Sequence, residues 1–521
     1  MTVNTPITKE VHLTNIGTEA VTINSITTEA PFSIGDYTQT ISSLQKITIP
    51  VTLTSTTEGN IEGKAIVSTN YGTKEITLRA YSGAFSHQYN VTTPGTINTL
   101  IPEAELPNII SVKLSGSINK TDIDFLKIKA TALKTLDLSE ATLENNTVGN
   151  SFFHSSTTLE TIILPTGITR IESSAFAESP SLKQVVIPES VNFIGSQAFL
   201  NCPALESIAL PSALRTLEGS SFQGCTNLKE VVIPELLQNI DGYAFTGCSG
   251  LETVKIGNGV TSLGGYYQTP VFEGCDNLTT LVIGDGITKL NNQFTGKTKL
   301  TSVTLGKNLQ ELHGTFNGCT ALETITLPDE LRTIGDNTFN GCTGLTTINF
   351  PDSTRTIGTT AFYNCSKLNG IILNDSLKNI GEQAFTNCSS LTEIAIPDKV
   401  ESIQRYTFNG CTALETVKIG NGVTNIGGYY QEAAFEGCNN ITTLIIGDGL
   451  TTLNAQFSGK AKLANITLGK GFKELHGTFN ECTALETITL PDELRTIGDN
   501  TFNGCTSLTT CLLYTSPSPR D

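Results

Sequence analysis

The sequence predicts a mainly β protein, in which a solenoid of 22–27-residue units is preceded by a small antiparallel β-sandwich. Each unit alternates apolar and polar residues over a short stretch, and a different strand pattern occupies the N-terminal part of the chain. A unit this short cannot bury its own apolar side, so it must stack on its neighbours. Phenylalanine marks the repeat at positions 153, 176, 199, 222, 245, 272, 294, 316, 339, 362, 385, 408, 435, 457, 479 and 502.

Residues 1–82 carry a β pattern that does not repeat. The stretches KEVHLTNIGTEAVTINSI, QKITIPVTLTST and GKAIVSTNYGTKEITLRAYS alternate apolar and polar residues, with Gly, Asn and Thr at short intervals. Such alternation predicts strands with one buried face, and the short turns favour an antiparallel β-sandwich. The domain resembles the immunoglobulin-like modules that precede repeats in bacterial surface proteins, and we expect it to act as a spacer.

Residues 83–130 are expected to form a linker and the N-terminal cap of the solenoid. The first coil of a solenoid needs such a cap because its core would otherwise face water. Thr121 or Asn119 is suited to begin a short helix over residues 122–130. Its inward-facing residues are predicted to be Ile123, Leu126 and Ile128. The stretch is similar to the entry segments of Bacteroides-type repeat proteins.

Residues 131–510 carry the repeat itself. In the segment LETIILP, Ile162 and Leu164 point to one face while Thr161 and Ile163 point to the other, which predicts a strand. The proline ends that strand. The segment ITRIESSAF then supplies a second short apolar stretch, and F-x-G-C turns the chain into the next coil.

The repeated unit LETITLPDELRTIGDNTFNGCTA resembles the BspA-like class of leucine-rich repeats, which is found in bacterial surface proteins. The resemblance covers about residues 131–510 and recurs in about sixteen units. It implies a leucine-rich repeat solenoid. It also implies a role as a surface adhesin or protein-binding protein, without naming the ligand.

A longer period lies over the short one. The series of phenylalanine spacings that begins at Phe245 begins again at Phe408. The segment CTALETITLPDELRTIGDNTFNGCT occurs from Cys319 and again, without a change, from Cys482. We interpret this as a copied block of seven units, with an assembly error as the alternative.

The copied block also predicts how residue 511 should continue. Position 348 predicts an isoleucine there, but residues 511–521 read CLLYTSPSPRD, which resembles the translation of a sequencing-library transposase adapter. We therefore interpret residues 511–521 as a sequencing-adapter artefact and the chain as a truncated fragment. The segment MTVNTPITKEVHLTN has no signal-peptide pattern, so we expect the true start and any anchor to lie outside the fragment.

The cysteines occupy one position of the repeat, just after the phenylalanine. Stacked side chains there point in parallel, which favours buried free thiols over disulfides, and no His or acidic partner recurs beside them to bind a metal. His313 and His476, in copies of ELHGTF, are interpreted as structural turn residues. Twelve of the thirteen cysteines follow the pattern: 202, 225, 248, 275, 319, 342, 365, 388, 411, 438, 482 and 505.

Composition limits the function classes. The chain has 32 Lys and Arg against 49 Asp and Glu, a net charge of −17, which disfavours nucleic-acid binding. No apolar run is long enough to span a membrane. No nucleophile elbow, zincin motif or P-loop is present, and the glycine turns IGNGV and IGDGI need no ion. We expect no enzyme activity, no cofactor and no metal, and a monomer.

Two surfaces are candidates for partner binding. The outward positions of the repeat strand form a polar face without aromatic residues, and here we single out Thr253, Lys255, Thr416 and Lys418. The 27-residue units carry GGYYQTPVF and GGYYQEAAF, whose extra residues place Tyr266, Tyr267, Tyr429 and Tyr430 on loops. Tyrosine on a loop offers amphipathic contact area. The alternatives are a plain solvated β surface and tyrosines that pack down on their own coil.

These observations lead to one expected function and one rival. We expect a non-catalytic extracellular or cell-surface protein that binds or adheres to a host or bacterial surface protein or glycan through the solenoid. The alternative is a structural spacer or scaffold that displays a domain lost by truncation.

Overall fold

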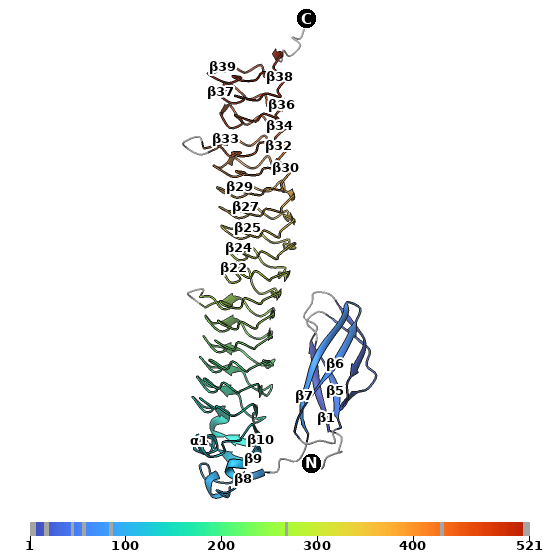
Figure 1. Cartoon of the computed structure of the whole chain (residues 1–521), viewed down its shortest axis with the longest axis vertical. Helices are drawn as coiled ribbons and strands as arrows, with labels where there is room; N and C mark the ends of the chain where they lie inside the picture. Colours follow the sequence, from blue (N-terminus) through green and yellow to red (C-terminus); the bar gives the residue numbers. More distant parts are fainter. Residues whose placement is uncertain are drawn as a thin grey trace. The chain divides into compact units, whose positions relative to one another are not determined.

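The structure is a computed structural model that describes residues 7–14, 20–42, 46–54, 59–82, 87–265, 269–427 and 432–513 (Figure 1). The chain divides into two compact units, one formed by residues 1–118 with 125–141 and the other by residues 119–124 with 142–521. The predicted domain boundaries at residues 82 and 130 stay predictions.

The N-terminal strands form two antiparallel sheets, which confirms the predicted β-sandwich. One sheet has the order β1-β5-β3 and the other β4-β2-β6-β7. Strand β1 pairs with β5 from Ile7↔Leu53 to Thr14↔Lys46. The strands are β1 (Ile7–Thr14), β2 (Val21–Thr28), β3 (Phe32–Ile34), β4 (Gln39–Ile41), β5 (Lys46–Leu53), β6 (Gly59–Thr69) and β7 (Gly72–Ser82).

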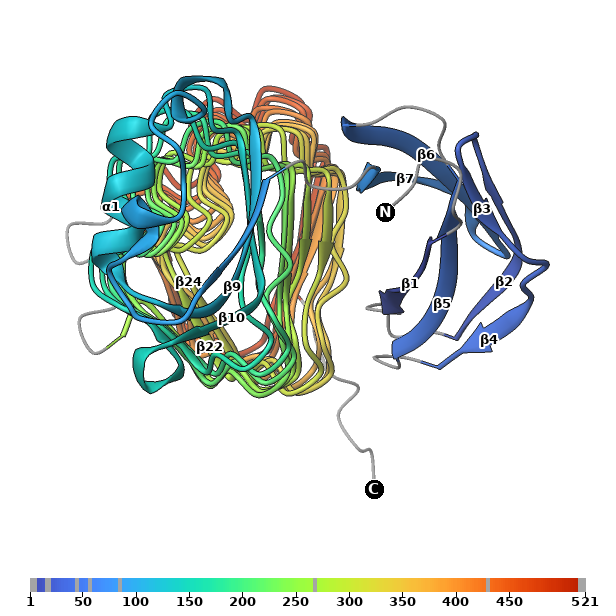
Figure 2. The same ribbon diagram turned by 90° about the horizontal axis from the view of Figure 1, so that it is seen from below.

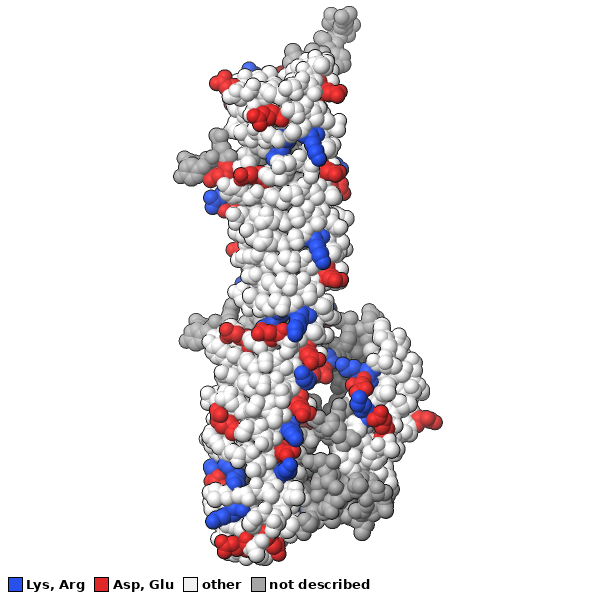
Figure 3. Space-filling model, in the orientation of Figure 1, with Lys and Arg blue, Asp and Glu red and all other residues white. Residues whose placement is uncertain are grey.

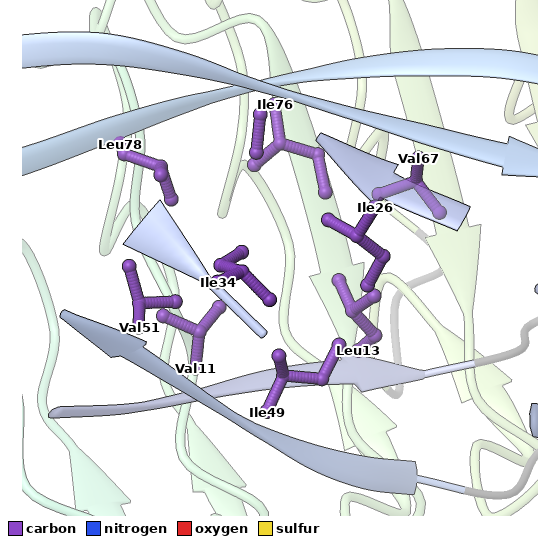
Figure 4. Close-up of a pocket in the computed structure, with 10 residues that line it drawn as sticks. Val11, Leu13, Ile26, Ile34, Ile49, Val51, Val67, Ile76 and Leu78 are labelled. Carbon is purple, nitrogen blue, oxygen red and sulfur yellow. The ribbon is translucent and has the colours of Figure 1, made fainter. Parts of the chain in front are cut away.

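Aliphatic side chains from both sheets fill the interior of the sandwich. Those labelled in Figure 4, among them Ile26, Ile49 and Val67, converge on a small gap between the sheets. Its volume is about 10 Å³, close to the least that one water needs, and its lining is wholly apolar. The gap is therefore a packing defect of the core rather than a ligand pocket.

A short helix follows the sandwich. Helix α1 (Lys120–Lys129) begins with a capping box in which Asp122 N donates to Asn119 Oδ1 at 3.2 Å and Asn119 N donates to Asp122 Oδ2 at 3.0 Å. The structure confirms Asn119 as the cap, and Ile123 and Leu126 are buried. The prediction for Ile128 was wrong: five residues after Ile123 it lies on the other side of the helix, and it is 69% exposed.

Around the helix, the chain forms a few further elements. Strand β8 pairs in parallel with β9, from His87↔Val112 to Val91↔Gly116. Sheet order in this part of the chain is β8-β9-β10-β12-β14. The elements are β8 (His87–Val91), η1 (Ile97–Thr99), η2 (Leu106–Asn108), β9 (Ser111–Ile118), β10 (Thr135–Leu143) and η3 (Glu144–Asn146).

The repeats form a parallel β-solenoid, as predicted. It has about 18 turns, against the roughly sixteen units counted in the sequence. Seen along its axis, the coils superimpose on one outline (Figure 2). The first strand of each repeat contributes to a first ladder, in which Thr161 and Ile163 face outward while Ile162 and Leu164 are buried. Its strands are β12 (Thr161–Ile163), β14 (Gln184–Val186), β17 (Glu230–Ile233), β19 (Thr253–Ile256), β21 (Thr280–Val282), β23 (Ser302–Thr304), β26 (Thr347–Asn349), β28 (Gly370–Ile372), β30 (Glu393–Ile396), β32 (Thr416–Ile419), β34 (Thr443–Ile446), β36 (Asn465–Thr467), β38 (Thr487–Leu490) and β40 (Thr510–Leu513).

A second ladder runs along another side of the coils. Its strands are only two or three residues long, because each coil turns again shortly after them. They are β11 (Thr147–Val148), β13 (Arg170–Ile171), β15 (Phe193–Ile194), β16 (Thr216–Leu217), β18 (Asn239–Ile240), β20 (Ser262–Leu263), β22 (Lys289–Asn291), β24 (Glu311–His313), β25 (Thr333–Ile334), β27 (Thr356–Ile357), β29 (Asn379–Ile380), β31 (Ser402–Ile403), β33 (Asn425–Ile426), β35 (Thr452–Asn454), β37 (Glu474–His476) and β39 (Thr496–Ile497).

The phenylalanines stack on one another through the interior. Neighbouring rings such as Phe176 and Phe199 are nearly parallel, with centroids 4.8 Å apart, close to the strand spacing. Backbone bonds hold the same register, since Phe176 N donates to Ala198 O at 2.7 Å. The turn after the phenylalanine needs a left-handed residue, which explains the glycine of F-x-G-C: Gly247 has φ of 73°.

The thiols of the twelve repeat cysteines lie in a second internal column. Cys202 Sγ donates to the carbonyl oxygen of Phe176 in the preceding coil at 3.2 Å, and Cys225 Sγ does the same to Phe199. Eleven of the twelve repeat cysteines are buried, Cys505 is partly buried, and all are free thiols. The burial predicted for this position is thereby confirmed.

The second ladder is interrupted at both 27-residue units. Strand β20 ends one sheet and β22 begins the next, and β33 and β35 are likewise separated. The ladder is also interrupted between β29 and β31, where the repeat has its ordinary length. The chain end predicted to be artefact is described only in part: β40 pairs Cys511 with Ile488, and residues 514–521 lie outside the described ranges.

Candidate binding surfaces of the solenoid

The first ladder presents the outward face that the sequence singled out, which we call the strand face. Thr253 and Lys255 lie on β19, where they pair in register with Thr280 and Val282 of the next coil. Thr416 and Lys418 lie at the same places on β32, seven coils further along. The structure thus places the two residues of each pair together, while the pairs themselves lie far apart, in two separate sheets of the first ladder.

Ion pairs occur on this face and beside it. Lys255 Nζ lies 2.5 Å from Glu230 Oε1 on the preceding strand. Beside the strands, Lys183 pairs with Glu160 at 2.8 Å and Lys229 with Glu252 at 3.2 Å. Figure 3 shows acidic and basic side chains alternating along one edge of the lower solenoid. Such exposed pairs add little stability, and they leave the face without a strong field of one sign.

Several aliphatic side chains stand out from the strand face. Val186 and Val232 are exposed in the early coils, and Ile445 in the later ones. The extreme case is Ile372 on β28, which is 76% exposed. Isolated apolar side chains are ordinary on a protein surface, but these lie in the column that also holds Lys255 and Lys418.

The predicted tyrosine loops are beyond what the structure describes. Tyr266, Tyr267, Tyr429 and Tyr430 lie in the undescribed segments 266–268 and 428–431. Both segments come shortly after strands of the second ladder, β20 and β33. Their role in binding remains a prediction.

Sequence reasoning missed a cleft in the first 27-residue unit. It lies where the second ladder is interrupted, between β20 and β22, and has a volume of about 130 Å³. Its walls include Ser262 and Leu263 from one coil and Lys289, Leu290 and Gln293 from the next. The 27-residue unit length was the available signal, because extra residues in a coil disturb the pairing with its neighbour.

Two lysines replace cysteine in the internal column, which sequence reasoning also missed. Lys297 and Lys460 are both buried. Lys460 Nζ donates to Phe435 O at 3.0 Å, the place a thiol takes in other coils, and burial lowers the pKa of this lysine. Lys297 Nζ lies 3.6 Å from Asp276 Oδ1. The sequence marks these two coils, because each has F-x-G-K where most of the other coils have F-x-G-C.

The two repeated histidines have structural contacts on the second ladder. His313 Nε2 lies 3.2 Å from Glu311 Oε2, and His476 Nε2 lies 3.3 Å from Glu474 Oε2. Hydrogen bonds from Lys289 and His313 hold the pKa of Glu311 below its usual range. Within the described ranges, no cluster of three His, Cys, Asp or Glu side chains is arranged to hold a metal ion. The described residues also contain no helix with the length and apolarity to cross a membrane.

Among solved structures, the chain is similar to leucine-rich repeat proteins. A leucine-rich repeat protein from Bacteroides ovatus is 28% identical, with a TM-score of 0.45 over 73% of this chain and 86% of its own. A leucine rich cell surface protein from Faecalibacterium prausnitzii is 22% identical, with a TM-score of 0.33 over 69% and 88%. A Treponema protein, the T. pallidum leucine rich repeat protein, is 26% identical, with a TM-score of 0.28 over 36% and 78%.

Comparison with curated proteins gives no match. The family described as "BspA type Leucine rich repeat region" matches residues 146–269, 229–315, 267–343, 312–431 and 429–517, which together cover most of the chain. These are the coils whose stacked phenylalanines and internal cysteines were described above. The chain belongs to the BspA type leucine-rich repeat family.

Proposed function

We propose that the protein is a non-catalytic binding or adhesion module that acts outside the cell. Its partner is a protein or a glycan on a host or bacterial surface, and the solenoid makes the contact. Membership of the BspA type family supports a binding role in general. Solenoids use long, regular faces of this kind to bind partners.

The observation that carries the proposal is the exposed column on the strand face. Its side chains are held by strands in register, so their spacing is fixed before a partner arrives. Apolar members such as Ile372 stand free of the core. A rigid, preordered face loses little conformational entropy on binding. We propose that Thr253, Lys255, Thr416 and Lys418 belong to this contact surface.

The tyrosine loops are proposed as a second contact region. Tyr266 and Tyr267 of the first copied block recur as Tyr429 and Tyr430 in the second. Two equal tyrosine pairs on one solenoid suit a repetitive or extended partner, because both pairs can engage the same molecule.

A structural spacer is the second candidate, and the stacked rings favour it. Nearly parallel phenylalanines from Phe153 to Phe294 tie seven coils together. Such a column resists bending between coils. A stiff solenoid would display another domain at a distance even if the strand face bound nothing.

Binding to immobilised extracellular-matrix proteins and to a mucin glycoprotein preparation distinguishes the two candidates. The variant Ile372→Asp alters the strand face, and Leu236→Asp is its control, because Leu236 is also exposed but lies in a turn outside the strands. We expect at least one surface to be bound, with at least tenfold weaker binding for Ile372→Asp and less than twofold change for Leu236→Asp. Absence of binding to every surface would favour the spacer.

A further inference from the structure

The cleft between β20 and β22 exposes backbone groups that other coils use for pairing. In a parallel ladder, alternate residues direct their N–H and C=O groups to opposite neighbours. Strand β20 pairs only with β18, and β22 pairs only with β24, among the strands that the structure describes. The backbone groups of Leu263 on one wall and Lys289 on the other therefore turn toward the cleft without a described strand opposite them.

Gln293 supplies a directed donor to the same cleft. Its Oε1 accepts the backbone N–H of Val271 at 3.1 Å, which fixes the orientation of the side-chain amide. The Nε2 group is then turned away from Val271, and it has no hydrogen-bond partner among the described residues. The residue is only 5% exposed, so this NH₂ group is held in place at the cleft wall. The Nε2 atom itself opens on the cleft, where the acceptor of a ligand can reach it.

The rest of the lining is mixed in character. The Ser262 side chain adds a hydroxyl, while Leu263 and Leu290 add apolar surface. Lys289 also lines the cleft, but its Nζ lies 3.0 Å from Glu311 Oε2, so its charge is balanced. The volume of about 130 Å³ is several times that of one water and has room for a single sugar ring.

We propose that this cleft binds one neutral sugar unit of a glycan, an inference that rests on the proposed binding function. Sugar hydroxyls both donate and accept, which matches exposed backbone carbonyl and amide groups together with the Gln293 amide and the Ser262 hydroxyl. The C–H face of a sugar ring packs on apolar surface such as that of Leu263 and Leu290. The balanced charge of Lys289 suits a ligand without a carboxylate.

The second 27-residue unit provides a comparison within the same molecule. Gln456 repeats the geometry, because its Oε1 accepts the backbone N–H of Ala434 at 3.0 Å. Its Nε2, however, lies close against Gly427: a Cβ placed on that glycine would be 2.8 Å away. Asn425 and Thr452 take the places of Ser262 and Lys289. The equivalent place in the second unit therefore differs at three of the positions that the proposal uses.

Saturation-transfer NMR with glucose, galactose, mannose and N-acetylglucosamine, each at about 10 mM, tests the proposal on the full chain. We expect at least one sugar to bind. The variant Gln293→Glu keeps the acceptor for Val271 and removes the donor, so it should weaken binding about tenfold. Gln456→Glu is the matched control and should change it less than threefold. Ser262→Ala, a mild change at a half-buried site, keeps the test open if Gln293→Glu does not fold.

Three outcomes would overturn the inference. The first is that none of the four sugars binds, and the second is that binding persists unchanged in both Gln293→Glu and Ser262→Ala. The third is that Lys289→Thr abolishes binding, which would mean that the cleft takes an anion. If surface binding still depends on Ile372 in these cases, the proposed function stands and only the sugar site fails. If sugar binding and surface binding are both absent, the sugar site and the proposed function fail together.

Discussion

The ammonium of Lys460 donates a hydrogen bond to the carbonyl oxygen of Phe435 at 3.0 Å, inside a column otherwise built mainly from cysteine thiols. In the next coil, Cys482 Sγ makes the equivalent bond to Phe457 O at 3.5 Å. Phe435 O also accepts the backbone N–H of Cys438 at 3.2 Å, so the lysine is not its only donor. A charged group thus occupies a place that a small neutral one fills elsewhere.

We expect Lys460→Met to raise the free energy of unfolding at pH 7 by about 1 kcal/mol, because it removes a buried amine while Cys438 still satisfies the carbonyl. Burial lowers the pKa of Lys460, so the charged ammonium is less stable in the folded state than in the unfolded chain. Its penalty is complete below the folded pKa and fades as pH rises toward 10.5. Urea unfolding of both proteins from pH 7 to 10 should show the difference shrinking. Lys462→Met is the exposed control, and destabilisation by Lys460→Met would contradict the argument.

The thiol column should make the protein sensitive to alkali. Burial raises the pKa of Cys202 and Cys275 to about 12, whereas an unfolded thiol titrates near about 8.5. The folded state keeps protons that the unfolded chain has already lost, so stability is complete below pH about 8.5 and falls as pH rises toward 12. We expect the urea midpoint to drop steadily over this window. The midpoint should fall less in Cys202→Ala and Cys275→Ala. A wild-type midpoint that is unchanged at pH 10.5 would show that the buried thiols do not make the protein sensitive to alkali.

The stacked rings should dominate the stability of each coil. Phe199 is fully buried between Phe176 at 4.8 Å and Phe222 at 4.9 Å. Phe199→Ala should lower the free energy of unfolding by about 3–5 kcal/mol. Phe193 is the control in the same coil: it is half-buried on the second ladder under the Arg170 guanidinium, at 3.6 Å, and Phe193→Ala should lose about 1 kcal/mol. Urea denaturation followed by circular dichroism measures both, and equal losses would rule out the special role of the stack.

The correction at helix α1 gives a matched pair of isoleucines. Ile123 is fully buried and Ile128 is 69% exposed on the same short helix. We expect Ile123→Ala to lower stability by about 2–5 kcal/mol and Ile128→Ala to stay within about 0.5 kcal/mol. Thermal unfolding of the two variants measures both losses of stability. A large effect at Ile128 would mean that another surface covers that side of the helix.

Repetition explains why so much of the solenoid was predictable. The regular recurrence of one unit sets the register of every coil, so the inward direction of Ile162, Phe176 and Cys202 follows from the same position in any other coil. The helix offered no such redundancy, and an error of one residue in the spacing, five after Ile123 instead of four, was enough to misplace Ile128. The sequence motif for Lys460 was visible, but its consequence depends on packing that only the structure shows.

The cleft was harder to foresee because it depends on a missing interaction. Gln293 is an ordinary residue in the sequence, and nothing in its neighbours marks its amide as unsatisfied. Its significance depends on the absence of pairing between the described strands β20 and β22, which is a property of two coils together. The length of the repeat unit indicated which coil departs from the others. Only the structure shows which side chains line the cleft in that coil.

A copied block begins at Phe245 and again at Phe408. The length of the solenoid can therefore change without creating contacts between coils that the protein does not already have. Each coil touches only its neighbours, so inserting or deleting a whole block of seven coils recreates junctions that the molecule already contains. Loss or gain of one copy would shorten or lengthen the solenoid in such steps. Versions of different length would then fold equally well and differ only in the distance that the solenoid spans.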